Sequence, residues 1–170
     1  MLMKRLFKEE IGRTWTALIG LRSLVMGQMT HESDPVLLDT SVWIHVFQGK
    51  AHRMVAVVRG LLNEDRVLTC GPVIFEIKRG LRPPERKKIL PLFDAVTRLS
   101  FDETLWDAAG DLDASLRKSG ITIPPMDIMI AQVCLHHDVS LLTLDAHFSS
   151  IRGLRLFQSG EVLSSIAGKY

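Results

Sequence analysis

Short apolar runs alternate with longer helical segments along most of this 170-residue chain. Each run is too short for a helix and is bounded by turn or capping residues, which is typical of strands buried on both faces of a parallel sheet. The runs are PVLLD, RVLTC, RLSF, VSLLTLD and LRLF. Strands that alternate with helices in this way predict an α/β fold with helices on both faces of the sheet. We therefore expect a three-layer α/β/α domain around a central, mostly parallel sheet of four to five strands.

Proline and short polar residues mark where several of the helices begin or end. Ser41 is expected to cap a helix that begins near Val42, because a serine hydroxyl accepts a hydrogen bond from a free backbone N–H at a helix start. Asp102 is expected to cap another helix in the same way. Pro91 should break or kink the helix that follows the paired prolines of RPPERKK, since proline lacks the backbone N–H that a helix interior needs.

The first 29 residues differ in charge from the rest of the chain. They hold five cations and two acids, a net charge of +3, and the whole chain carries +2, so the remainder carries −1. The segment resembles a signal peptide only superficially, because Arg22 interrupts its apolar run, and it is too short and too charged to span a membrane. We expect residues 1–29 to be an N-terminal extension, either a loose appendage or the product of an upstream start codon, and residues 30–170 to form one folded domain.

The cysteines, and the net charge of residues 30–170, indicate the cellular compartment and the kind of partner to expect. Cys70 and Cys134 lie far apart in apolar sequence, which indicates buried, reduced thiols as in a cytoplasmic protein, and no membrane partner is expected. The body is not basic overall. Any binding of nucleic acid must therefore come from a local cationic patch.

Four carboxylates stand in or beside apolar segments, where an uncompensated charge is costly. Asp39 and Asp145 follow predicted strands, and in parallel sheets ligands bind beyond the carboxyl ends of the strands. Glu76 and Asp127 lie in predicted helices with largely apolar faces. For any one of them alone, a helix cap or a buried hydrogen-bond acceptor is an equally good explanation. Four that converge would repel one another and require a cation.

Clustered carboxylate oxygens suit a hard divalent ion such as Mg²⁺ or Mn²⁺. An ion held in this way can bind a phosphate oxygen, lower the pKa of an attacking water and stabilise the leaving oxygen, which is the chemistry of phosphodiester hydrolysis. We assign Asp39, Asp127 and Asp145 as metal ligands. Thr40 and Thr143 stand beside the strand-end acids and are expected to orient a carboxylate or a water.

Four segments of the chain together resemble the PIN domain, and more closely the VapC-type toxins of bacterial toxin–antitoxin pairs. The segments are LLDTSVWI, PVIFEIKRG, PPMDIMIAQVCLHH and LLTLDAHF. The resemblance covers roughly residues 35–157 and contains the four acids in order. Carried over position by position, the catalytic acidic quartet of the family matches Asp39, Glu76, Asp127 and Asp145, and the hydroxyl after the first acid matches Thr40.

The resemblance implies an endoribonuclease that depends on Mg²⁺ or Mn²⁺ and cuts structured RNA such as tRNA or rRNA. It also implies a homodimer and a cognate VapB-type antitoxin that blocks the site. Two other functions stay open at this point. One is a phosphoryl-transfer or phosphatase-like enzyme with Asp39 as the nucleophile, and the other is a catalytically inactive RNA-binding PIN module.

A basic segment, KRGLRPPERKK, follows Glu76 and holds six cations against one acid. It is interpreted either as a phosphate-binding patch on the path of an RNA or as a solvated surface around a turn. Its position beside a proposed catalytic acid favours the first interpretation. We assign Lys78, Arg79 and Arg82 as the RNA-binding residues.

Other aromatic and acidic residues are weaker candidates for a site. Phe75 and two further aromatic residues in apolar runs have the side chains to stack on bases, but their helical spacing favours packing in the core or in a dimer interface. The two others are Trp43 and Phe47. Three acids lie on one helix with a separate apolar stripe, which favours a solvated face. They are Asp107, Asp111 and Asp113.

Overall fold

A single four-stranded parallel sheet forms the centre of the protein. The structure is a computed structural model that describes residues 34–49 and 52–157. The strands are β1 (Val36–Leu38), β2 (Val67–Cys70), β3 (Thr97–Leu99) and β4 (Ser140–Leu142), in the order β3-β2-β1-β4. The expected sheet of four to five parallel strands is confirmed. The last apolar run, LRLF, adds only an isolated parallel bridge between Leu141 and Leu156.

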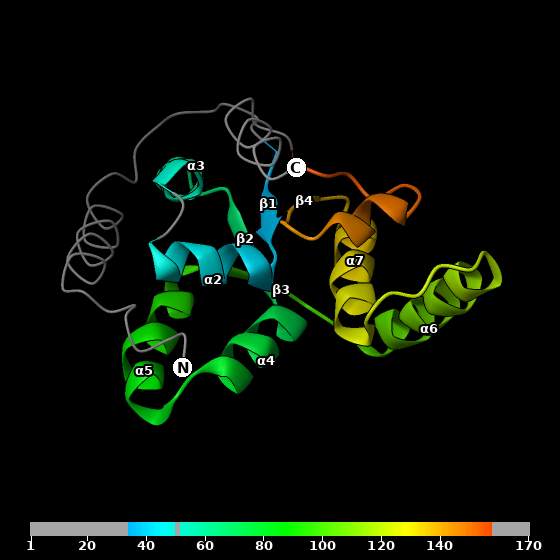
Figure 1. Ribbon diagram of the computed structural model, residues 1–170, viewed down its shortest axis with the longest axis horizontal. Helices are drawn as coiled ribbons and strands as arrows, with labels where there is room; N and C mark the ends of the chain where they lie inside the picture. Colours follow the sequence, from blue (N-terminus) through cyan, green and yellow to red (C-terminus); the bar gives the residue numbers. More distant parts are fainter. Residues whose placement is uncertain (1–33, 50–51, 158–170) are drawn as a thin grey trace.

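Helices occupy every connection between the strands and cover both faces of the sheet. They are α2 (Thr40–Gln48), α3 (His52–Asn63), α4 (Gly71–Gly80), α5 (Pro83–Ile89), α6 (Glu103–Lys118) and α7 (Pro125–His137), with 3₁₀ turns η2 (Leu90–Ala95) and η3 (Ala146–Ser150). The chain moves outward from β1 to β2 to β3 and then returns to place β4 on the other side of β1. Right-handed crossovers therefore put α2 to α5 on one face and α6 and α7 on the other. Figure 1 shows α6 and α7 on the opposite side of the molecule from α2 to α5.

The two central strands are buried completely, as their sequences predict. Val36, Leu37 and Leu38 of β1 are each 0% exposed, and all four residues of β2 are buried. Burying a side chain of this size contributes about 1.5–3 kcal/mol to folding, so apolar residues are favoured along both strands. The edge strand β3 has two exposed residues, Thr97 and Arg98.

Most helix boundaries follow the local sequence signals, with one correction. The side chain of Asp102 accepts a hydrogen bond from the backbone N–H of Leu105 (3.2 Å), so its expected role as an N-cap is confirmed. The helix after the paired prolines ends before Pro91, where the chain continues as a 3₁₀ turn, as expected. The prediction for Ser41 is wrong, because α2 begins at Thr40, two residues before the expected start at Val42, and its N-cap is Asp39.

Both cysteines are buried and free, as expected. The predicted boundary between an extension over residues 1–29 and a domain over residues 30–170 lies outside the residues that the structure describes. Within the described ranges, no helix combines the length and the apolar character needed to cross a membrane.

The order of the strands determines where a ligand-binding site is expected on this apolar sheet. The sheet is extended to one side of β1 by β2 and β3 and to the other side by the parallel strand β4, so the strand order reverses between β1 and β4. The backbone N–H of Asp39 donates to the carbonyl of Leu142 across the ends of these two strands (3.0 Å). Loops that leave a parallel sheet at such a switch point diverge to opposite faces and open a place for a ligand. The carboxyl ends of β1 and β4 are therefore where a functional site is expected.

Candidate active site

The side chain of Asp39 lies at the carboxyl end of β1 and is held from three directions. Its Oδ1 accepts a hydrogen bond from the backbone N–H of Thr40 (2.7 Å), and its Oδ2 accepts one from the hydroxyl of Ser41 (2.6 Å) and one from the hydroxyl of Thr143 (2.9 Å). Asp39 is 2% exposed. Hydrogen bonds to a carboxylate of this kind compensate part of the cost of burying its charge.

Glu76 reaches the same place from α4, which lies beside α2. The hydroxyl of Thr40 donates to Oε2 of Glu76 at 2.7 Å. Thr40 therefore contacts one carboxylate with its side chain and another with its backbone N–H. Thr143 has the corresponding role toward Asp39 from the end of β4.

Asp127 enters from the opposite face of the sheet, in the first turn of α7. Pro125 at the first helical position starts the helix, and the carboxylate lies near the free N–H groups of that end. A carboxylate in the first turn is favoured by the helix dipole. Because α7 runs antiparallel to the strands, its first turn meets the carboxyl ends of β1 and β4.

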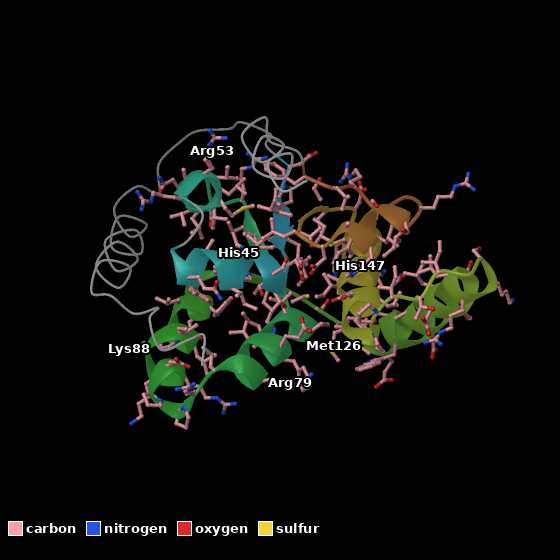
Figure 2. The ribbon with its side chains drawn as sticks, viewed as in Figure 1. His45, Arg53, Arg79, Lys88, Met126 and His147 are labelled. Atoms are coloured by element: carbon pink, nitrogen blue, oxygen red, sulfur yellow. The ribbon has the colours of Figure 1, made fainter. Side chains whose placement is uncertain are left out.

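Three of the four acids identified from the sequence form one compact cluster. Ligand oxygens of Asp39, Glu76 and Asp127 all lie within 4.8 Å of one another. We call these three residues the acidic cluster. Figure 2 shows side-chain oxygens gathered in the region between α2 and α7, near the labelled His147.

Asp145 stands outside the acidic cluster, at the start of η3, and is exposed. Its backbone N–H donates to the hydroxyl of Thr143 (3.0 Å), which in turn donates to Asp39. Partial desolvation and the nearby carboxylate of Asp39 raise the pKa of Asp145 above its ordinary value. Asp145 is thus electrostatically linked to the cluster without being part of its compact core.

The pKa of Asp127 reflects both its burial and its repulsion by the neighbouring carboxylates. Burial, followed by the charges of Asp39 and Glu76, raises the pKa of Asp127 from 3.8 to about 6, and the imidazole of His147 opposes this shift. A group of carboxylates that repel one another and expose few of their oxygens is relieved by a proton or by a cation. The arrangement can therefore hold a divalent metal ion.

The structure adds two residues that were not identified as parts of the site. Ser41 donates to Asp39 and accepts a hydrogen bond from the backbone N–H of Leu144 (3.1 Å), so it joins α2 to the loop after β4. His147 places its Nε2 2.9 Å from Oδ2 of Asp127. A local signal for His147 was present, since it stands two residues after Asp145, but the contact itself joins positions far apart in the chain.

The other aromatic, acidic and basic residues singled out from the sequence lie either in the core or on the surface. Trp43 and Phe47 are buried and their rings pack together in the core, whereas Phe75 is 53% exposed. Asp107 and Asp111 are exposed on α6, and Asp113 forms an ion pair with Arg117 on the same helix (2.8 Å), as a solvated face requires. The three cations assigned to RNA binding are all exposed.

Replacing Asp127 with asparagine should stabilise the metal-free protein at alkaline pH. The pKa of Asp127 is higher in the folded than in the unfolded protein, so between about pH 4 and pH 6 the folded state binds more protons and its stability falls as the pH rises. A neutral amide lacks this penalty. Allowing for solvent screening, we expect Asp127→Asn to gain about 1 kcal/mol at pH 8 and almost nothing at pH 4.

Urea unfolding of both proteins in EDTA at the two pH values measures this difference. Asp107→Asn on the exposed face of α6 is the matched control and should show no pH-dependent gain. An equal effect of Asp127→Asn at both pH values would contradict the assigned pKa.

Comparison with solved structures finds this fold in proteins of toxin–antitoxin complexes. A chain of VapBC2 from Rickettsia felis, bound to a promoter DNA fragment, is 18% identical with a TM-score of 0.62, over 72% of this chain and 96% of that chain. A chain of DNA-bound VapBC from Salmonella typhimurium is 22% identical with a TM-score of 0.63, over 74% and 98%. A chain of VapBC-1 from nontypeable Haemophilus influenzae is 24% identical with a TM-score of 0.62, over 72% of this chain and 96% of that chain. At these identities the likeness shows a common fold.

Sequence comparison gives a more direct assignment. A search of curated proteins finds no significant match. The family model of the PIN domain, however, matches residues 36–154, which begin with β1 and extend past β4 and η3. The matched segment includes the whole acidic cluster and Asp145. Because it spans well over half of the sequence, the chain belongs to the PIN domain family.

Proposed function

We propose that this protein is a metal-dependent endoribonuclease and the toxin of a toxin–antitoxin pair. The observation that carries the proposal is the acidic cluster, in which carboxylates from the end of β1, from α4 and from the first turn of α7 come within 4.8 Å of one another. Membership of the PIN domain family makes hydrolysis of phosphodiester bonds the reaction class for such a cluster. Related folds in VapBC complexes support the role as a toxin.

The residues present fit a hard divalent ion. Mg²⁺ and Mn²⁺ bind carboxylate oxygens and keep several waters, so a few carboxylates at one edge of a sheet suffice. Asp39, Glu76 and Asp127 would hold the ion, and Asp145 is proposed as a fourth catalytic acid at the edge of the cluster. A bound ion would polarise the phosphate and lower the pKa of the attacking water.

The hydroxyl groups of the site keep the carboxylates in place before any ion arrives. Thr143 and Ser41 donate to one oxygen of Asp39, and Thr40 donates to Glu76. Each donor reduces the freedom of a carboxylate that would otherwise turn away from its neighbours. A site whose ligands are already oriented loses less entropy when it binds an ion and substrate.

The geometry disfavours the two alternative functions. Nucleophilic attack by Asp39 on phosphorus would need an accessible oxygen, but Asp39 is 2% exposed and both of its oxygens accept hydrogen bonds. An inactive RNA-binding module would have no use for mutually repelling carboxylates, because phosphate binding requires cations.

Conservative neutralisation of the acidic cluster should abolish RNA cleavage. Asp39→Asn and Asp127→Asn each remove one charge from the proposed ion site while keeping size, and asparagine is as good an N-cap as aspartate at position 39. Loss of several kcal/mol of transition-state stabilisation corresponds to at least a 100-fold lower rate. The measurement is cleavage of total tRNA with Mg²⁺ or Mn²⁺, with and without EDTA.

Asp107→Asn, on the exposed face of α6, serves as the control and should cleave at the wild-type rate. Circular dichroism and thermal unfolding establish that each variant is folded. Wild-type activity that persists in EDTA, or in both cluster variants, would refute the proposal.

Cations on α4 and after it are proposed to bind the RNA backbone. Lys78 and Arg79 are exposed in the last turn of the helix that carries Glu76, and Arg82 follows at the start of α5. The guanidinium of Arg86 donates to the carbonyl of Lys78 (2.6 Å) and so joins α5 to α4. Figure 2 shows Arg79 on α4 and Lys88 on α5 on the same side of the molecule.

Neutralising two of these cations should weaken RNA binding and reduce its dependence on salt. Each contact between a cation and a single-stranded phosphate contributes about 0.7 to the slope of log K against log salt, so Arg79→Gln with Arg82→Gln should lower the slope by about 1.4. Fluorescence anisotropy with tRNA in EDTA measures binding without cleavage. Arg117→Gln on α6, where the arginine pairs with Asp113, is the control. An unchanged slope would remove the assignment of this patch.

An antitoxin and a homodimer complete the proposed system. The similar chains come from VapBC complexes, one of which, from Mycobacterium tuberculosis, is described as a member of the VapBC family of toxin–antitoxin systems. We expect a small neighbouring gene to encode a VapB-type antitoxin that restores growth to cells that make this protein. Native mass spectrometry of the co-expressed pair should show two copies of this chain in one complex. Growth arrest that the neighbouring product does not relieve would contradict this part of the proposal.

A further inference from the structure

We propose that His147 is a positioning residue that holds the carboxylate of Asp127 in the acidic cluster, an inference that rests on the metal-dependent function proposed above. The Nε2 atom of His147 lies 2.9 Å from Oδ2 of Asp127. The Asp127 side chain is 14% exposed and the His147 side chain 33%. The contact is thus largely shielded from water, and its effect on the carboxylate is larger than at an open surface.

The ring of His147 is held independently of Asp127. It stacks on the neighbouring Phe148, with the ring centroids 4.8 Å apart and the planes inclined by 29°. Phe148 is 0% exposed and belongs to the core. A ring that is anchored to the core provides a stationary partner for a carboxylate on a different element. The 3₁₀ turn η3 therefore supports α7 through this one pair.

The contact has the distance of a hydrogen bond but not the alignment. Nε2 of His147 is a buried nitrogen for which no hydrogen bond of acceptable geometry is formed within the described residues. Buried polar atoms are rarely left without an aligned partner unless they serve a function. A small turn of the Asp127 carboxylate would align the pair, and hydrogen bonds in active sites commonly tighten when the site is loaded.

The consequence is a division of labour between the two oxygens of Asp127. A donor that holds Oδ2 would leave Oδ1 available to an ion bound by Asp39 and Glu76. Groups that hydrogen-bond a metal ligand typically contribute 10- to 100-fold to metal affinity. Since His147 lies two residues after Asp145, the same turn also determines where that fourth acid stands.

Binding of Mn²⁺ to the full-length protein, followed by isothermal titration calorimetry, tests this role separately from RNA cleavage. His147→Phe keeps an aromatic ring on Phe148 and removes the donor, and it should weaken Mn²⁺ binding by about 10- to 100-fold. His147→Gln places an amide N–H at a similar reach and should bind within about threefold of wild type. His136→Phe makes the same change at an exposed histidine in the last turn of α7 and should leave binding unchanged.

The outcomes separate this inference from the proposed function. Wild-type protein that binds no Mn²⁺ would overturn the metal site itself, and the positioning role with it. Wild-type affinity in His147→Phe would overturn the positioning role alone. Equal losses in His147→Phe and His147→Gln would overturn it as well, because the amide N–H of glutamine would then restore no affinity. If His147→Phe does not fold, His147→Gln and His147→Leu, which both lack the ring and differ in the donor, make the same comparison.

Discussion

The carboxylate of Asp39 is 2% exposed and is coordinated by hydrogen bonds from α2 and from the loop after β4. These donors compensate the cost of burying a charge in this position, and one of them, the hydroxyl of Thr143, reaches Asp39 because the strand order brings β4 beside β1. The same carboxylate starts α2 as its N-cap. The side chain of Asp39 thus marks the end of β1, starts α2 and forms part of the acidic cluster with Glu76 and Asp127.

The acidic cluster carries a cost that the rest of the fold must offset. Three carboxylates within 4.8 Å repel one another, and the pKa of Asp127 is raised by burial first and by this repulsion second. The fully buried strands β1 and β2 and the helices packed on them supply the stability that allows such a site to persist. A cation that binds the acidic cluster only in the folded protein would stabilise the fold and offset part of this repulsion.

Much of the fold and most of the site follow from patterns that are local in the sequence. Apolar runs of strand length, separated by helices, predicted the parallel sheet, and the carboxylates at strand ends predicted where polar chemistry would lie. The N-cap at Asp102 and the break at Pro91 are equally local, because each depends only on the chemistry of one residue and its neighbours. The error at Ser41 arose because two nearby residues, Asp39 and Ser41, are both good caps, and the choice between them depends on where the strand ends.

The sequence by itself determined which residue types are available, their order, and the α/β architecture, because period and capping act over a few residues at a time. It identified all three members of the acidic cluster as catalytic acids, and it assigned Asp145 rather than Glu76 as the third metal ligand beside Asp39 and Asp127. Only the tertiary structure decided that distinction, since Glu76 reaches Asp39 through the packing of α4 beside α2 and a hydrogen bond from Thr40. The contact of His147 with Asp127 was decided in the same way, because α7 precedes β4 and η3 follows it, and the two residues meet only when β4 is in place in the sheet.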